Sequence, residues 1–205
     1  MYDMLISRYP AAVGKVQIVQ QPPPEWLLSH QPAPPRQNVS RLRLFYPAAS
    51  YPHKNHDLVR SMVQLPDANK LIDRIQVTLP SEADASLPLL VPVGRLGPED
   101  MRKSYDFADA LFFPSFSESY GLPLIEAMWL GLPIVCADLP YARTLCRDQA
   151  MYFDPSDPVA ALRAVSGLRD RMRRGWRPDW QACLRDIPRD WDSVAQRMMT
   201  IVQGA

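Results

Sequence analysis

The sequence has few cysteines and no excess of charge of either sign. Its cysteines are Cys136, Cys146 and Cys183. Their spacing fits neither a disulfide framework nor a metal site, which favours free thiols in a reducing compartment. The formal net charge of +1 gives no basis for binding nucleic acid. No apolar run approaches a membrane span, and no basic segment followed by an apolar one opens the chain. We therefore expect a cytoplasmic globular protein.

Proline, in contrast, is abundant, with 22 residues, many in the first third of the chain. The stretches 21–24 and 31–35 are proline-rich and typical of extended linkers, with at most a short strand at 16–19 before them. The length of 205 residues suffices for one well-packed domain but is short for two. We therefore expect residues 1–40 to differ in structure from a domain formed by residues 41–205.

From Arg41 onward, strand-like and helix-like segments alternate. Strands are predicted at 42–46, 75–79, 89–93, 110–113 and 134–137. Helices are predicted at 58–63, 98–108, after Gly121, and at 141–146, 157–167 and 191–202, with Asp157 as an N-cap. This alternation predicts an α/β fold with a Rossmann-like parallel sheet and helices on both faces. The last helix is expected to dock on the core.

Two glutamates eight positions apart, Glu118 and Glu126, mark the candidate site. Between them, Gly121 permits a tight turn and Pro123 suits the first turn of a helix. A helix that begins near Leu122 leaves its first N–H groups unpaired, and such groups bind phosphate well. Acceptor-only carboxylates on both sides of a phosphate cradle suit a ligand with hydroxyls on both sides of a diphosphate. A sugar nucleotide is such a ligand.

The alternative is that both glutamates are solvated carboxylates near a helix start, where the helix dipole favours them. Their surroundings argue against this. Buried strands are predicted directly before the pair, at 110–113, and after it, at 134–137. Open α/β folds bind their ligands at such strand-to-helix junctions. The functional interpretation is therefore favoured.

The segment from Phe113 to Met128, FPSFSESYGLPLIEAM, followed by Gly131-Leu132-Pro133, resembles the donor-binding signature of the retaining glycosyltransferases of family 4. These enzymes have the two-domain GT-B fold. Residues 45–56 are similar to the first strand and loop of the family's donor domain. The resemblance implies a single GT-B half, with residues 1–40 as a remnant of the N-terminal domain and linker and 41–205 as the donor-binding domain.

The resemblance also implies roles for individual residues. Lys54 would contact the donor diphosphate, and a compact ammonium suits the charge on a departing phosphate. Glu118 would accept from the sugar hydroxyls and Glu126 from the ribose hydroxyls. The remaining implied ligand contacts come from backbone groups, at Tyr120, Gly121 and Leu122 for the diphosphate and at Gly94 and Arg95 for the base.

The chain lacks one cationic residue of the family pattern. Many relatives have an arginine at the position of Ala49, and Arg95 or Arg43 are the candidates to replace it. The loop 78–82 also lacks the family's glycine-rich turn. Nearby, Asn55 is interpreted as a helix cap. His53 and His56 are interpreted as exposed loop histidines rather than phosphate ligands.

The resemblance predicts the nucleotide-sugar-binding half of a retaining, metal-independent hexosyltransferase of polysaccharide biosynthesis. Its donor would be a UDP- or GDP-sugar, bound as substrate rather than as a cofactor. The chain would be either a truncated or split gene product or one subunit whose protein partner supplies the acceptor domain. The alternative is a non-catalytic nucleotide-binding or scaffold module. A basic C-terminal segment, 169–177, with Trp176 and Trp180, gives weak support for peripheral membrane contact against a solvated helix face. Asp190 and Asp192 fit a helix start better than a metal motif.

Overall fold

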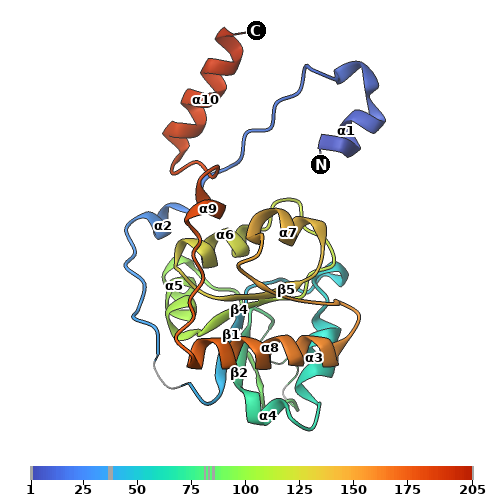
Figure 1. Ribbon diagram of the computed structural model, residues 1–205, viewed down its shortest axis with the longest axis vertical. Helices are drawn as coiled ribbons and strands as arrows, with labels where there is room; N and C mark the ends of the chain where they lie inside the picture. The colour runs from blue at the N-terminus through green and yellow to red at the C-terminus, as the bar shows by residue number, and fades with distance from the viewer. Residues whose placement is uncertain (1, 37–38, 81, 83, 85, 205) are drawn as a thin grey trace.

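The centre of the molecule is a parallel sheet of six strands (Figure 1). The structure is a computed structural model that describes residues 2–36, 39–80, 82, 84 and 86–204. The strands are β1 (Leu42–Tyr46), β2 (Ile72–Val77), β3 (Leu90–Pro92), β4 (Ala110–Phe113), β5 (Ile134–Ala137) and β6 (Met151–Phe153). They lie in the order β3-β2-β1-β4-β5-β6, with every neighbouring pair parallel. The predicted Rossmann-like α/β fold is confirmed.

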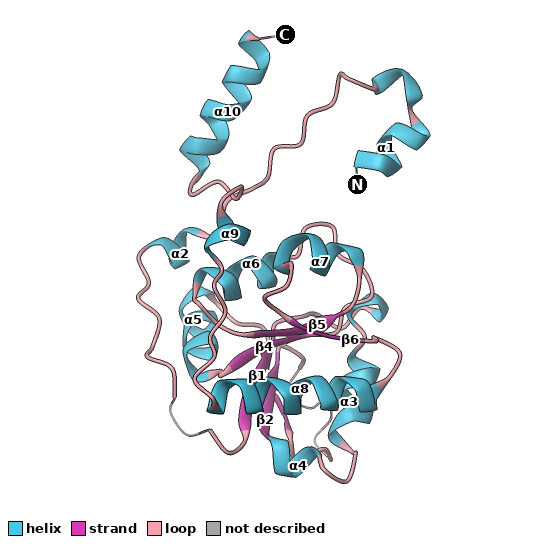
Figure 2. Cartoon of the chain, viewed as in Figure 1, coloured by secondary structure: helices cyan, strands magenta, loops and turns pink. Residues whose placement is uncertain are grey.

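Helices cover both faces of the sheet (Figure 2). One face carries α5 (Pro98–Phe107), α6 (Leu122–Trp129) and α7 (Pro140–Cys146), and the other carries α3 (His56–Val63), α4 (Ala68–Leu71) and α8 (Pro158–Arg173). Because the central strands are covered on both sides, β4 and β5 consist entirely of buried residues. The three cysteines are buried free thiols.

Some helices and strands have boundaries that differ from those predicted, because strand pairing and packing extend them beyond the local sequence signal. β2 begins three residues before the predicted strand, because Ile72 pairs with Leu42 of β1. β6 was not predicted, and α8 continues past Gly167 to Arg173. The predicted cap of α8 is confirmed, since the Asp157 carboxylate accepts from the N–H groups of Val159 and Ala160.

The proline-rich segment is attached to the domain at several points, among them helix α5. We call residues 19–36 the strap; it includes the short helix α2 (Glu25–Leu28), and residues 16–19 before and within it form no strand. His30 lies 2.8 Å from the Asp106 carboxylate, and Ala33 N–H donates to the same group at 3.3 Å. Leu27 is fully buried. The strap therefore belongs to the packed domain and is not a free linker.

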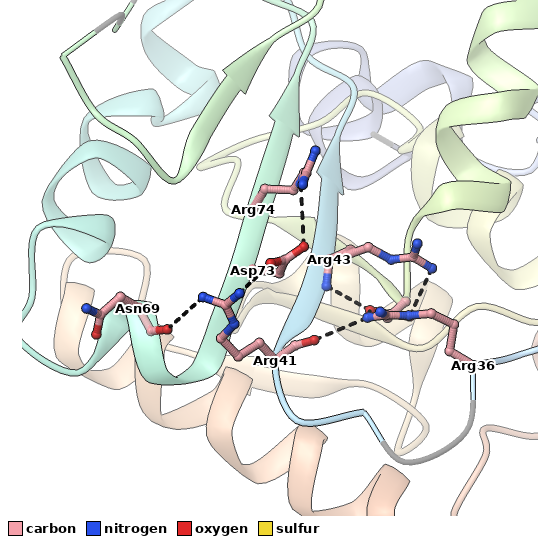
Figure 3. A network of polar contacts seen from close by, with 7 residues as sticks. Arg36, Arg41, Arg43, Asn69, Asp73 and Arg74 are labelled. Carbon is pink, nitrogen blue, oxygen red and sulfur yellow. Dashed lines mark hydrogen bonds and ion pairs between the residues drawn. The ribbon is translucent and has the colours of Figure 1, made fainter.

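The strap ends in a polar network at the amino edge of the sheet (Figure 3). The buried Asp109 carboxylate binds the Arg36 guanidinium and accepts from the backbone N–H of Arg43 at 2.7 Å. Arg41 pairs with Asp73 at 2.9 Å in the same network. Arg43 is thus at the edge opposite to the strand ends that carry the candidate site. It does not replace the arginine missing at Ala49, so that suggestion was wrong.

The last helix does not dock on the core, contrary to expectation. After α9 (Gln181–Leu184), helix α10 (Trp191–Gln203) projects away from the domain, on the same side as the N-terminal helix α1 (Tyr2–Arg8) and the turn η1 (Pro10–Ala12) (Figure 1). Asp190 caps α10 as predicted, accepting from Ser193 N–H at 2.8 Å. Amphipathic spacing was correctly recognised, but it does not specify which surface covers the apolar face.

The C-terminal aromatic residues are mostly engaged within the domain. Trp180 is 4% exposed and donates its indole N–H to the Leu132 carbonyl at 3.0 Å. Arg171 lies over the Trp176 ring at 5.6 Å. These contacts leave little of the aromatic surface that the membrane-contact alternative requires. Among the described helices, none combines the length and the apolar character needed to cross a bilayer.

Candidate functional site

The candidate site lies where the order of strands along the sheet reverses. β1, β2 and β3 follow one another in one direction, whereas β4, β5 and β6 follow in the other. The carboxyl ends of β1 and β4 are therefore adjacent but lead into helices on opposite faces. Open α/β sheets bind ligands at this switch point. The loops that follow β1 and β4 carry the two predicted catalytic residues, Lys54 and Glu118.

The structure brings these two residues into direct contact. Lys54 Nζ donates to Glu118 Oε1 at 2.6 Å across 64 positions of sequence. The side chains are only 17% and 9% exposed, so the pair is largely shielded from water. An ammonium in such a position is attractive to a phosphate oxygen, and its three donors allow it to keep the glutamate while it binds an anion.

The backbone beside this pair has the predicted form. Gly121 has φ +84° and occupies the N-cap position of α6, with Pro123 in the first turn. A side chain at Gly121 would lie 3.1 Å from Leu145 Cδ1, so glycine is needed for both conformation and space. Within the described part of the chain, the N–H groups of Tyr120, Gly121 and Leu122 donate to no backbone carbonyl. They are available to an anion in front of α6.

Glu126 lies one turn inside α6 and is 8% exposed. Its Oε2 accepts from the Tyr105 hydroxyl of α5 at 2.6 Å. Burial raises the pKa of Glu126, and the hydrogen bond from Tyr105 partly opposes this shift. Burial, reinforced by the Glu126 charge, raises the pKa of Tyr105 well above its usual value, so the phenol keeps its proton. Tyr105 carried no sequence signal, because a single aromatic residue in a helix is ordinary core.

The predicted base-binding segment follows β3, farther along the same edge of the sheet. Gly94 has φ +71° and donates its N–H to the Leu79 carbonyl at 2.8 Å, which leaves its carbonyl as the backbone group open to a ligand. Arg95 is exposed. No hydrogen bond or ion pair within the described residues joins either residue to Lys54, Glu118 or Glu126.

Two residues of the β1 loop behave differently from expectation. His56 is buried, not exposed, and its Nε2 lies 3.1 Å from the Ala49 carbonyl. Burial lowers the pKa of His56, which favours the neutral ring. Asn55 occupies the N-cap position of α3 but makes no side-chain cap. Its amide instead donates to the Pro114 and Pro155 carbonyls at 3.1 and 2.8 Å.

The β1 and β4 loops are also joined by Tyr46 at the end of β1. Its hydroxyl donates to the Lys54 carbonyl at 2.5 Å and lies 3.0 Å from Ser115 Oγ. Phe116 N–H donates to the His53 carbonyl at 2.8 Å. These contacts fix the backbone on both sides of the Lys54–Glu118 pair. Sequence spacing gave no indication of them, because each contact joins residues that are far apart in the chain or depends on a folded loop.

Comparison with known proteins finds similarity to glycosyltransferases over part of the chain. The sequence model described as glycosyl transferases group 1 matches residues 73–170. The D-inositol 3-phosphate glycosyltransferase of Nocardia farcinica is 40% identical over 82 residues, which cover 38% of this chain and 18% of that protein. An O-antigen chain mannosyltransferase of Salmonella typhimurium is 27% identical over 140 residues, covering 62% and 39%. The matched region thus spans less than two fifths of these relatives.

Solved structures share the fold at low sequence identity. Sucrose-phosphate synthase from Thermosynechococcus elongatus superposes with a TM-score of 0.65 at 15% identity, covering 99% of this chain and 56% of that one. The catalytic domain of starch synthase IV from Arabidopsis thaliana, bound to ADP and acarbose, gives 0.59 at 14% identity, covering 80% and 38%. These similarities establish a GT-B type of domain.

Proposed function

We propose that this chain, whose residues 73–170 match the sequence model of the group 1 glycosyl transferases, binds the nucleotide-sugar donor of a retaining hexosyl transfer. The donor is a UDP- or GDP-linked hexose, and the acceptor is a glycan or a lipid-linked glycan. The O-antigen mannosyltransferases among the relatives support an acceptor of this kind. The reaction requires a second, acceptor-binding domain and no metal ion.

One observation carries this proposal. The Lys54–Glu118 pair, 2.6 Å apart, lies beside the unpaired N-terminus of α6 at the switch point of the sheet. A cation and a helix N-terminus together suit a diphosphate. The Glu118 carboxylate at the same point suits the hydroxyls of the sugar that is attached to the diphosphate. A simple phosphate site would need no such acceptor.

The chemistry follows from these positions. The bond between the anomeric carbon and the diphosphate oxygen breaks, and an acceptor hydroxyl oxygen bonds to that carbon from the same face. The proton of the acceptor hydroxyl passes to the departing phosphate oxygen. Lys54 and the N–H groups at the start of α6 stabilise the negative charge that grows on the diphosphate. Glu118 orients the sugar, so catalysis rests mainly on positioning and electrostatics.

The acceptor-binding domain has a suitable contact surface on this chain. On α10, Trp191, Met198, Met199 and Val202 are 54–72% exposed. Across a groove from the end of α10 lie Gly14, Lys15, Gln17 and Val19 of the N-terminal segment. Exposed apolar faces of this extent are typical of surfaces that bind another protein or domain. We propose that this surface contacts the acceptor domain.

Calorimetric titration with UDP, GDP and their hexose conjugates tests the donor site. The expected result is micromolar binding of one diphosphate, about −8 kcal/mol. Lys54→Ala is expected to weaken it at least tenfold, because a charged contact to phosphate is lost, at about 1.5–3 kcal/mol. Lys70→Ala, at an exposed side chain of α4, is the matched control and should bind normally. Absence of binding to every nucleotide would contradict the proposal.

Ala49 favours a second candidate, a nucleotide-binding module without catalysis. Its side chain offers no cation, and its carbonyl contacts His56. The two candidates differ once an acceptor domain is supplied. Transfer that is lost in Glu118→Gln while nucleotide binding persists supports the enzyme, whereas binding with no transfer in the complemented wild type supports the module.

A further inference from the structure

Tyr105 and Glu126 form a buried polar pair between α5 and α6. The Tyr105 hydroxyl donates to Glu126 Oε2 at 2.6 Å, and the two residues are 1% and 8% exposed. An ionised carboxylate has about four acceptor positions. Within the described residues only this one hydrogen bond reaches it. A buried acceptor with so few donors gains strongly from a ligand that brings its own hydroxyl groups.

The Tyr105 ring is held on two sides. Phe45 of β1 meets it edge-on, with ring centroids 5.0 Å apart and an interplanar angle of 89°. Trp26 of the strap stacks on it at 6.1 Å and 29°. Packed aromatic rings of this kind hold a single rotamer, so the Tyr105 hydroxyl has a fixed direction.

The strap is tied to the candidate site at a second point. The Tyr120 hydroxyl donates to the Gln21 carbonyl at 2.6 Å, five residues before Trp26. Tyr120 directly precedes the glycine at the start of α6. The strap therefore connects the residue beside the diphosphate cradle with the ring that orients Glu126.

We propose that Tyr105 is a positioning residue which, clamped by Trp26 of the strap, fixes Glu126 Oε2 so that Oε1 accepts from the vicinal hydroxyls of a ribose. This inference rests on the proposed function, since it assumes a nucleoside diphosphate at the site. It assigns the strap a part in recognising the nucleotide. A site built around hydroxyl donors discriminates sharply against analogues that lack them.

The test compares the diphosphate that the wild type binds with its 2′,3′-dideoxy analogue, by calorimetry. Tyr105→Phe removes only the hydroxyl and keeps the packing. We expect it to weaken the ribonucleotide on the order of tenfold and to leave the dideoxy analogue unchanged. Tyr152→Phe, which loses a hydrogen bond to the Arg147 carbonyl at the far edge of the sheet, is the matched control and should change neither affinity.

A purely structural role for Tyr105 would weaken both ligands equally. The affinity for the ribonucleotide relative to that for the dideoxy analogue would then be unchanged in Tyr105→Phe, and this result would overturn the inference. Trp26→Leu provides a second variant, which leaves the hydroxyl in place but frees the ring, and it should lower the same ratio. A wild type that binds no nucleotide would overturn the proposed function itself, which separates the two failures.

Discussion

The charge of single residues decides how the candidate site responds to pH. Glu126 is the clearest case, because burial raises its pKa above the ordinary value of 4.5. A raised pKa means that the folded state holds the proton more strongly than the unfolded chain does. The stability from this group is therefore complete below the unfolded pKa and is lost as pH rises through the folded one.

Glu126→Gln should accordingly stabilise the free protein at neutral pH. We expect the free energy of unfolding to rise by about 1 kcal/mol, because an incompletely bonded buried charge is removed. The gain should vanish below about pH 3, where the wild-type carboxyl is neutral in both states. Thermal melts across this range measure it, with the exposed Glu99→Gln as control. A loss of stability at neutral pH would contradict the assignment of a buried charge.

The conformation of Gly121 gives a second prediction. Gly121→Ala should lower stability by about 2 kcal/mol, because alanine is strained at φ +84° and its Cβ meets Leu145. Gly131→Ala is matched in conformation, at φ +69°, but its Cβ would meet no atom within 4 Å. It should cost about 1 kcal/mol. Urea unfolding of both variants separates the cost of backbone strain from the cost of the contact with Leu145. Equal losses of unfolding free energy would show that this contact is unimportant.

Residue-level prediction succeeded where chemistry is local. The turn at Gly121 and the caps at Asp157 and Asp190 follow from residue types a few positions apart. The family resemblance assigned both Lys54 and Glu118 to the candidate site, but their direct contact was not predicted, because it joins two loops 64 positions apart in sequence. The partner of Glu126 was not predictable, because Tyr105 lies 21 positions away on a different helix and resembles any core aromatic residue.

Among the elements, the strap most changes the interpretation of the sequence. Proline content predicted an extended chain, which is correct for most of residues 19–36. It gave no information about attachment, which depends on ion pairs with α5 and the adjoining Asp109. Likewise, the periodicity of α10 identified an apolar face but not its partner.

The strap's final anchor is predicted to be important for stability. Asp109→Asn should destabilise by about 3 kcal/mol, since it leaves Arg36 and the half-buried Arg43 without their carboxylate. Asp73→Asn is the control from the same network (Figure 3), and its exposed pair with Arg41 should contribute less than about 1 kcal/mol. Chemical denaturation compares them. Equal effects would show that burial of Asp109 gives the anchor no added strength.

At the scale of the whole molecule, α10 and the N-terminal segment dominate its association behaviour. An uncovered apolar face promotes contact between copies. We expect the isolated chain to self-associate with increasing concentration in analytical ultracentrifugation. Met199→Gln with Val202→Gln should reduce this, because both side chains are more than half exposed on α10. Gln196→Glu on the same helix serves as control. A strictly monomeric wild type would argue against the surface as a docking site.

The position of Asn55 has a consequence for the energetics of ligand capture. Its single amide joins the loop after β1 to Pro114 in the loop after β4 and to Pro155 after β6. These three loops are therefore held together before a ligand binds. A flexible site would have to bring them together at each binding event. Little conformational entropy then remains to be lost on binding. Association should be limited by diffusional encounter, and exchange of the hydrogen-bonded amides in these loops, such as those of Lys54 and Phe116, should already be slow before any nucleotide arrives.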